Sequence, residues 1–175
     1  RELKLSRSLD PESQVIALLP GSRKSEVSRM VKVFLKTAQM IRKSKKSTNF
    51  FMPFAESSHL SIVPNLKDFG WVNFSVGDSQ EVLAFSDIGI VTSGTATLEA
   101  ALLRTPVVVA YKTGFLTYNL IRPLLKISQF ALPNLLAKKS ILPELIQNEV
   151  TSSNLFKAFN QLDQKNYKIC LETFQ

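Results

Sequence analysis

Three short turns in this sequence carry side chains that could bind a phosphate or a sugar. The first is Ser93-Gly94-Thr95, which follows the apolar run Asp87–Val91 and precedes a helical pattern. Backbone amides at the start of a helix donate hydrogen bonds, and the helix dipole is positive there. With the hydroxyl groups of Ser93 and Thr95, this turn favours a diphosphate cradle that needs no lysine. The simpler alternative is that Ser93 or Thr95 only caps the helix.

Glu99 lies about one turn further into the same helical pattern. A carboxylate that faced the phosphates would repel them, so we expect Glu99 to accept hydrogen bonds from a ribose diol displaced to one side. The turn is not the dinucleotide fingerprint, because the sequence contains no G-x-G-x-x-G, and it lacks the G-K-[ST] of a P-loop.

The second turn is Pro20-Gly21-Ser22-Arg23, which also follows an apolar run and opens a helical pattern. Its amides, the Ser22 hydroxyl and the Arg23 guanidinium could hold a phosphate, and arginine does so with two parallel hydrogen bonds. Arg23 could equally be an ordinary surface residue. The phosphate-binding interpretation of this turn is favoured because a parallel sheet places the turn beside the Ser93–Thr95 turn.

The third turn is Pro133-Asn134, which lies between apolar residues. Proline followed by asparagine favours a turn, although the Asn134 amide could also reach a sugar or a phosphate. His59 is the only histidine and Cys170 the only cysteine. No typical cluster of metal ligands is present, so we expect neither a metal nor another cofactor.

Short apolar runs alternate with amphipathic segments along the chain. This order predicts an α/β fold, a Rossmann-like parallel sheet with helices on both faces. The predicted strands are Val15–Leu19, Asn49–Pro53, Trp71–Val76, Asp87–Val91 and Val107–Ala110. The predicted helices are Val27–Ile41, Glu56–Asn65 (the weakest), Gln80–Phe85, Thr95–Leu103, Phe115–Lys126 (interrupted by Pro123), Pro143–Gln147 and Ser152–Leu162.

The 175 residues fit a single domain over 1–175, with a helical tail from about 143. A hydrophobic content of 45% argues against disorder, and no apolar run reaches the ~20 residues that span a bilayer. The chain opens with Arg1 and has no initiator methionine, so we expect it to be a fragment of a longer protein.

The net charge of +8 is unevenly distributed, because no acidic residue lies between Glu99 and Glu144. That stretch includes the apolar run Phe115–Leu125 and six basic residues. An anionic membrane surface would attract it, although a buried helix with solvated lysines would look the same. Nucleic-acid binding usually shows aromatic residues that stack bases among the basic residues, whereas the phenylalanines here mostly occupy core-like positions, so we do not expect nucleic acid as a partner.

Three motifs, in this order and spacing, resemble the C-terminal half of lipid-A-disaccharide synthases, and the similarity runs from about 13 to about 159. A TSGT-x-x-LE turn alone would fit several glycosyltransferases of the GT-B type, whereas PNLLA followed by PELIQ narrows the choice. The segments are LLPGSRKSEV (Leu18–Val27) with FLKTAQMIR (Phe34–Arg42), SDIGIVTSGTATLEAALLRTPVVVAYK (Ser86–Lys112), and ALPNLLA (Ala131–Ala137) with PELIQ (Pro143–Gln147).

The resemblance implies a GT-B enzyme that transfers 2,3-diacylglucosamine from UDP-2,3-diacylglucosamine to lipid X (2,3-diacylglucosamine 1-phosphate). The products are the β-1,6-linked lipid A disaccharide 1-phosphate and UDP, and no metal takes part. A homodimer at the cytoplasmic face of the inner membrane is implied as well, with the general base in an N-terminal acceptor domain that this chain lacks. The chain alone is then expected to be inactive.

The resemblance also assigns roles to individual residues. Gly21, Ser22 and Arg23 would steady the diphosphate, and the catalytic positions would be Arg23 and Asn134, with Asn134 in the cleft near the donor. Glu99 would hold the ribose. The diphosphate pocket would be lined by Ser93, Gly94, Thr95 and Ala96. The rival readings are a peptidoglycan N-acetylglucosaminyltransferase, a UDP-sugar epimerase, and a non-enzymatic basic module for membranes or nucleic acid.

Overall fold

The computed structural model describes residues 9–10, 12–45, 47–114, 131–137 and 141–165. Within them, six strands form one sheet in the order β3-β2-β1-β4-β5-β6, and each neighbouring pair is parallel. The strands are β1 (Gln14–Leu19), β2 (Thr48–Phe54), β3 (Val72–Val76), β4 (Ile88–Thr92), β5 (Val107–Tyr111) and β6 (Glu144–Ile146). The predicted parallel α/β sheet is therefore confirmed.

The central strands are continuous apolar runs because both faces of the sheet are covered. In β1, Ile16 and Leu18 pack toward one hydrophobic cluster, and Val15, Ala17 and Leu19 pack toward another. Residues on alternate sides of a strand thus supply two cores from one sequence run.

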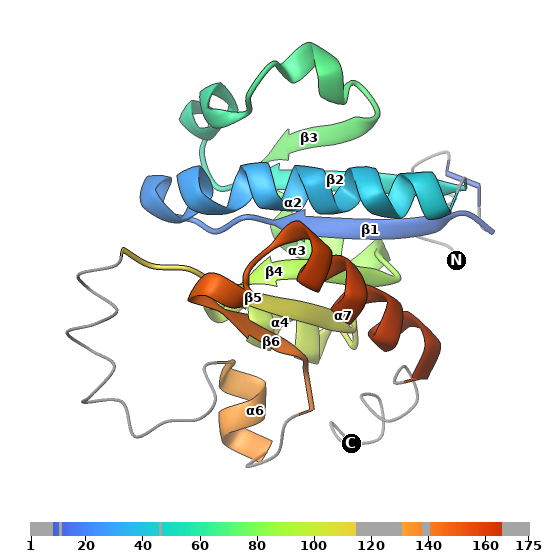
Figure 1. The fold of residues 1–175 in the computed structure, drawn as a ribbon, viewed down its shortest axis with the longest axis vertical. Coiled ribbons are helices and arrows are strands. Elements are labelled where there is room, and N and C mark those ends of the chain that lie inside the picture. Colours follow the sequence, from blue (N-terminus) through green and yellow to red (C-terminus); the bar gives the residue numbers. More distant parts are fainter. Residues whose placement is uncertain (1–8, 11, 46, 115–130, 138–140, 166–175) are drawn as a thin grey trace.

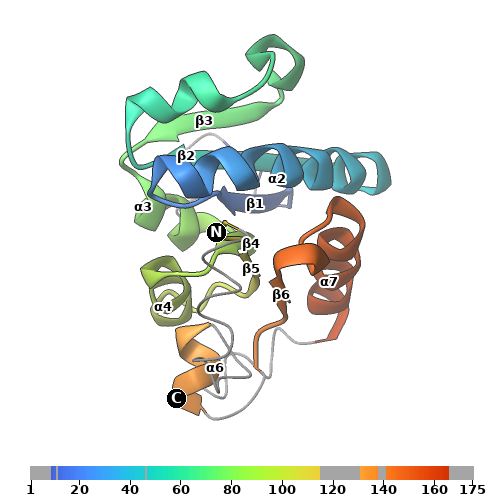
Figure 2. The same cartoon turned by 60° about the vertical axis from the view of Figure 1, so that its left-hand side comes forward.

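Helices α2 (Lys24–Ser44) and α7 (Ser152–Lys165) cover one face of the sheet, and α3 (Ser79–Phe85) and α4 (Thr95–Leu102) cover the other (Figures 1 and 2). An apolar stripe at three- and four-residue steps makes α2 amphipathic, and its core side includes Val27, Met30 and Phe34. The short α6 (Leu132–Ala137) packs near α4. No helix of the described part is long and apolar enough to cross a bilayer.

Several predictions of local structure are wrong. The segment Pro143–Gln147 is not a helix. Three of its residues, Glu144–Ile146, form β6, and pairing with β5 decides their conformation. Asn134 lies inside α6 rather than in a turn. The weak helix predicted for Glu56–Asn65 is a 3-10 helix, Ser57–Ile62, which a second one, Leu66–Phe69, follows. The predicted helix Phe115–Lys126 lies outside the described residues.

Candidate nucleotide-binding site

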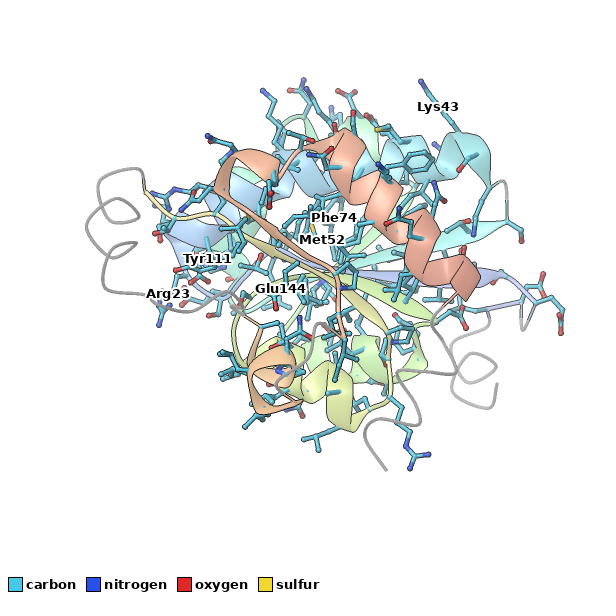
Figure 3. All side chains as sticks on the ribbon, turned by 60° about the horizontal axis from the view of Figure 1, so that its bottom comes forward. Arg23, Lys43, Met52, Phe74, Tyr111 and Glu144 are labelled. Carbon is cyan, nitrogen blue, oxygen red and sulfur yellow. The ribbon has the colours of Figure 1, made fainter. Side chains whose placement is uncertain are left out.

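A cavity of about 490 Å³ opens at the carboxyl ends of β1, β2 and β4. Ligands of open parallel sheets bind at this edge, where the loops after the strands meet. Figure 3 places Arg23 on the same side of the molecule as Tyr111, the last residue of β5, and far from Lys43 near the other end of α2. The predicted site residues that line the cavity are Gly21, Ser22, Arg23, Ser93, Gly94, Thr95, Ala96 and Glu99.

The first turn of α4 meets the cavity without a cap. Its N-cap residue is Gly94, which has no side chain to bond to the exposed end of the helix. The amides of Thr95 and Ala96 open the helix, where N–H groups have no intrahelical acceptor. The N-cap position is therefore held by neither Ser93 nor Thr95, and a helix end of this kind suits an anion.

The geometry of the turn before α4 is fixed by bonds that leave its cavity side open. The Ser93 amide donates to the Ala110 carbonyl of β5 at 2.9 Å, and the Thr97 hydroxyl donates to the Gly94 carbonyl at 2.7 Å. A methyl group added at Gly94 would meet no atom within 4 Å. The space beside Gly94 is therefore room for a ligand.

The first turn of α2 also lines the cavity, but the Glu26 carboxylate already binds the amides at the start of this helix. Glu26 Oε2 accepts hydrogen bonds from the amides of Ser22 and Arg23, each at 3.2 Å. Glu26 Oε1 accepts from Arg23 Nη1 at 2.9 Å, although the Arg23 side chain is 81% exposed. The predicted anion-binding amides of this turn are thus already engaged.

Glu99 is half-buried and lies on the wall of the cavity, one turn into α4. It also borders an adjoining hollow that Gly77, Asp78 and Ser79 line. Its carboxylate is therefore displaced along the helix from the uncapped end, as a group that binds a sugar diol beside a diphosphate must be.

Asn134 is not among the residues that line the cavity. Its side chain is fully buried and bridges α6 to the chain that leads into β6. The oxygen accepts from the amides of Ile141 and Leu142 at 2.9 and 2.8 Å, and the nitrogen donates to the Leu142 carbonyl at 2.8 Å and to Glu144 Oε1. These bonds use the full capacity of the amide, so the geometry supports a structural role, and the catalytic role stays a prediction.

Sequence reasoning missed seven residues that line the cavity, and two of them, Glu26 and Thr92, bear directly on its chemistry. Glu26 stands three residues after the N-cap Arg23, the spacing at which a glutamate reaches back to the start of its helix, and that spacing was the available signal. Thr92 ends β4 and lines the cavity beside Ser93. A polar residue at the end of an otherwise apolar strand was the only hint of it.

Residues with metal-ligating chemistry do not gather in the described part of the chain, where no group of three His, Cys, Asp or Glu side chains could hold a metal ion. His59 is 2% exposed and packs edge-on against Phe54, at ring centroids 6.4 Å apart. It is thus a core residue and does not line the cavity.

The sheet order, its helices on both faces and the cavity at its carboxyl edge define a Rossmann-like α/β domain. Solved structures agree on the fold. A UDP-GlcNAc 2-epimerase from Neisseria meningitidis bound to UDP-GlcNAc matches with a TM-score of 0.62 at 16% identity, over 99% of this chain and 42% of that one. WaaG, a glycosyltransferase involved in lipopolysaccharide biosynthesis, matches with a TM-score of 0.62 at 16% identity, over 99% and 44%.

Sequence comparison is more specific. The family model for lipid-A-disaccharide synthetase matches residues 1–172, and the chain belongs to that family. It is 43% identical to a lipid-A-disaccharide synthase of Cellvibrio japonicus, over 86% of this chain and 40% of the relative. It is 36% identical to that of Idiomarina loihiensis, over 99% and 47%. The chain thus spans less than half the length of these relatives.

Proposed function

We propose that this chain is the donor-binding half of a lipid-A-disaccharide synthase and that its cavity holds the UDP of UDP-2,3-diacylglucosamine. Membership of the family supports the reaction class. The observation that carries the site is the uncapped start of α4, which faces a cavity with open space beside Gly94. The first turn of α4 contains no acidic residue, and a diphosphate would neutralise its positive end.

The proposed reaction joins two acylated glucosamine units. The 6-hydroxyl of lipid X attacks the anomeric carbon of the donor, the bond to UDP breaks, and a general base outside this chain accepts the hydroxyl proton. The leaving UDP gains negative charge on its β-phosphate, and amides aimed at developing charge stabilise such a step. Thr95 and Ala96 supply amides of this kind at the start of α4, so no metal is required.

The remaining residues would bind the other parts of the donor. Glu99 would accept hydrogen bonds from the ribose hydroxyls. Arg23 would add a charge to the diphosphate after exchanging its bond with Glu26, which its exposure permits. A role for Asn134 in catalysis requires that its bonds to 141–144 rearrange.

Titration of the chain with UDP by isothermal calorimetry tests the site. We expect saturable binding with one UDP per chain, and weaker binding of uridine, because uridine lacks the diphosphate. A soaked crystal should show the diphosphate against Gly94–Ala96. Binding of uridine and UDP with equal affinity would contradict the proposed role of α4.

The rival enzymes use the same fold but different sugars. Family membership favours the diacylated donor over that of a peptidoglycan enzyme or an epimerase. The complete protein should therefore consume UDP-2,3-diacylglucosamine in the presence of lipid X and leave UDP-N-acetylglucosamine unused. Equal use of both donors would contradict the proposed substrate.

An exposed apolar patch supports an anionic membrane surface as a second partner. Leu102 at the end of α4 is 84% exposed and Leu136 of α6 is 75% exposed, with Leu103, Leu132 and Leu135 also exposed. The patch lies within the stretch that has no acidic residue. Such a surface suits the headgroup region of anionic lipid.

Vesicle sedimentation separates the contributions to membrane binding. The chain should bind phosphatidylglycerol vesicles more tightly than phosphatidylcholine vesicles, and a Leu102→Ser and Leu136→Ser double variant should bind both less. Unchanged binding of that variant would exclude the patch. The proposed homodimer rests on family resemblance alone, and light scattering during size-exclusion chromatography measures it directly.

A further inference from the structure

Thr92 is the last residue of β4, and its side chain is 4% exposed. It has the same parity as Ile88 and Ile90, which pack into the cluster that α2 and α7 cover. Thr92 therefore belongs to the face of the sheet on which α2 begins, whereas the turn that follows it leads to α4 on the other face. Thr92 therefore lies in the cavity wall between the residues that begin α2 and those that begin α4.

The hydroxyl of Thr92 has no hydrogen-bond partner among the residues that the structure describes. The other buried threonines of the described residues each donate to a carbonyl: Thr37 to Val33 at 2.9 Å, Thr97 to Gly94 at 2.7 Å and Thr105 to Leu83 at 2.8 Å. Buried hydroxyl groups without partners are uncommon because their desolvation is not compensated. Valine has nearly the same shape and would fill this position in a purely structural sheet.

We propose that the Thr92 hydroxyl is a ligand-binding group that donates a hydrogen bond to a phosphate oxygen of the bound nucleoside diphosphate. The proposal rests on the function proposed above and adds a side-chain donor to the amides of α4. Of the cavity-lining groups that face the diphosphate, Glu26 and Glu99 only accept hydrogen bonds when ionised. A donor without a partner at the end of β4 complements an anion, and a bond to a charged acceptor is about twice as strong as a neutral one.

A ligand-binding Thr92 and a purely structural Thr92 predict different effects of substitution on the unfolding midpoint and on UDP affinity. In the free protein, Thr92→Val removes an unsatisfied polar group without changing volume, so its unfolding midpoint should equal or exceed that of the wild type. In the complex, the same change removes a bond to a charged oxygen, and UDP affinity should fall about tenfold or more. Thr92→Ser keeps the hydroxyl and should retain UDP affinity within about twofold.

The experiment measures thermal unfolding without ligand and UDP binding by calorimetry for the wild-type chain, Thr92→Val, Thr92→Ser and Thr105→Val. Thr105 is the matched control, because its hydroxyl is buried and bonded and does not line the cavity. Thr105→Val should lower the unfolding midpoint and leave the UDP affinity of the folded chain unchanged.

Each outcome has one meaning. A loss of UDP affinity in Thr92→Val, with no loss of unfolding midpoint, supports the inference. Equal UDP affinity in Thr92→Val and wild type overturns the inference and leaves the proposed function intact. A drop in midpoint as large as that of Thr105→Val overturns it too, since the hydroxyl would then be bonded in the free protein. No binding of UDP by the wild type overturns both the inference and the proposed function.

Discussion

Helices α2 and α4 both begin at the same cavity, and their first turns differ in whether an acidic side chain of the protein binds there. At α2, the Glu26 carboxylate accepts two amide hydrogen bonds and pairs with Arg23. At α4, the N-cap is Gly94, which has no side chain, and the first turn contains no acidic residue. One helix end thus carries its own anion, and the other has the same positive potential with no anion beside it.

The difference shows why two similar sequence signals differ in function. Both turns follow a strand, contain glycine and serine, and open a helix, so the sequence alone favours an anion at each. The glycines have opposite roles, since Gly21 has a backbone φ of 113° and a Cβ atom there would collide with Glu26, whereas Gly94 borders open space. The first glycine serves the fold, and the second leaves room for the ligand.

The largest effect should come from filling the space at α4. Gly94 has an extended backbone that other residues adopt (φ 164°), so Gly94→Leu should fold with a stability within about 0.5 kcal/mol of the wild type. The side chain would occupy the position of the diphosphate, and UDP affinity should fall by about a hundredfold or more, which is at least ~2.7 kcal/mol. Calorimetry measures the affinity and urea unfolding the stability. Retained UDP binding would place the diphosphate elsewhere.

At α2 we expect substitution of the glycine to lower stability, because Gly21 is required by the local backbone and packing. A methyl group in Gly21→Ala would lie 2.7 Å from Glu26 Cβ, on a left-handed backbone that favours glycine. The free energy of unfolding should fall by about 2 kcal/mol, as measured by urea denaturation. Gly94→Ala is the control and should lose none. If the two alanine variants were equally stable, the first turns of α2 and α4 would not differ as described.

The predictability of each element follows from where its determinants lie. Strand β1 was predicted because VIALL is apolar over its whole length, a local property that burial on both faces demands. Strand β6 was not, because its three half-buried residues take their conformation from pairing with β5. Asn134 was read as a turn because its partners at 141–144 lie beyond any local window.

The site follows the same rule. Because the carboxyl ends of parallel strands share an edge, the sequence predicts that the two turns lie close together. The cavity is indeed lined by Ser93–Ala96, Glu99 and the Gly21–Arg23 turn. The state of the two helix ends depends on which side chain reaches which amide, and the one sequence signal that distinguishes them is Glu26, three residues after the N-cap of α2. Thr92 was missed because a single polar residue at the end of an apolar strand is only a weak signal in sequence.

The two carboxylates of the cavity should respond to neutralisation in opposite directions. Glu99→Gln weakens an acceptor for the ribose hydroxyls, so affinity for UDP should fall about tenfold. The matched probe is inorganic pyrophosphate, whose competition with a fluorescent UDP analogue should not weaken, because it has no ribose. If pyrophosphate and UDP lost affinity equally, Glu99 would act on the diphosphate or on the fold instead.

The smallest effect, at Glu26, gives the sharpest test of the comparison because its sign is diagnostic. Glu26→Gln removes a negative charge from the cavity and releases the Arg23 guanidinium, which lies 2.9 Å from Glu26 Oε1. UDP affinity should therefore rise about threefold at low salt and converge with that of the wild type at high salt, where charges are screened. The unfolding free energy should fall by about 0.5–1 kcal/mol, since the start of α2 loses its charged partner. Calorimetry at two ionic strengths measures the effect. A fall in affinity would mean that Glu26 positions Arg23 for the ligand, and that both helix ends serve the nucleotide.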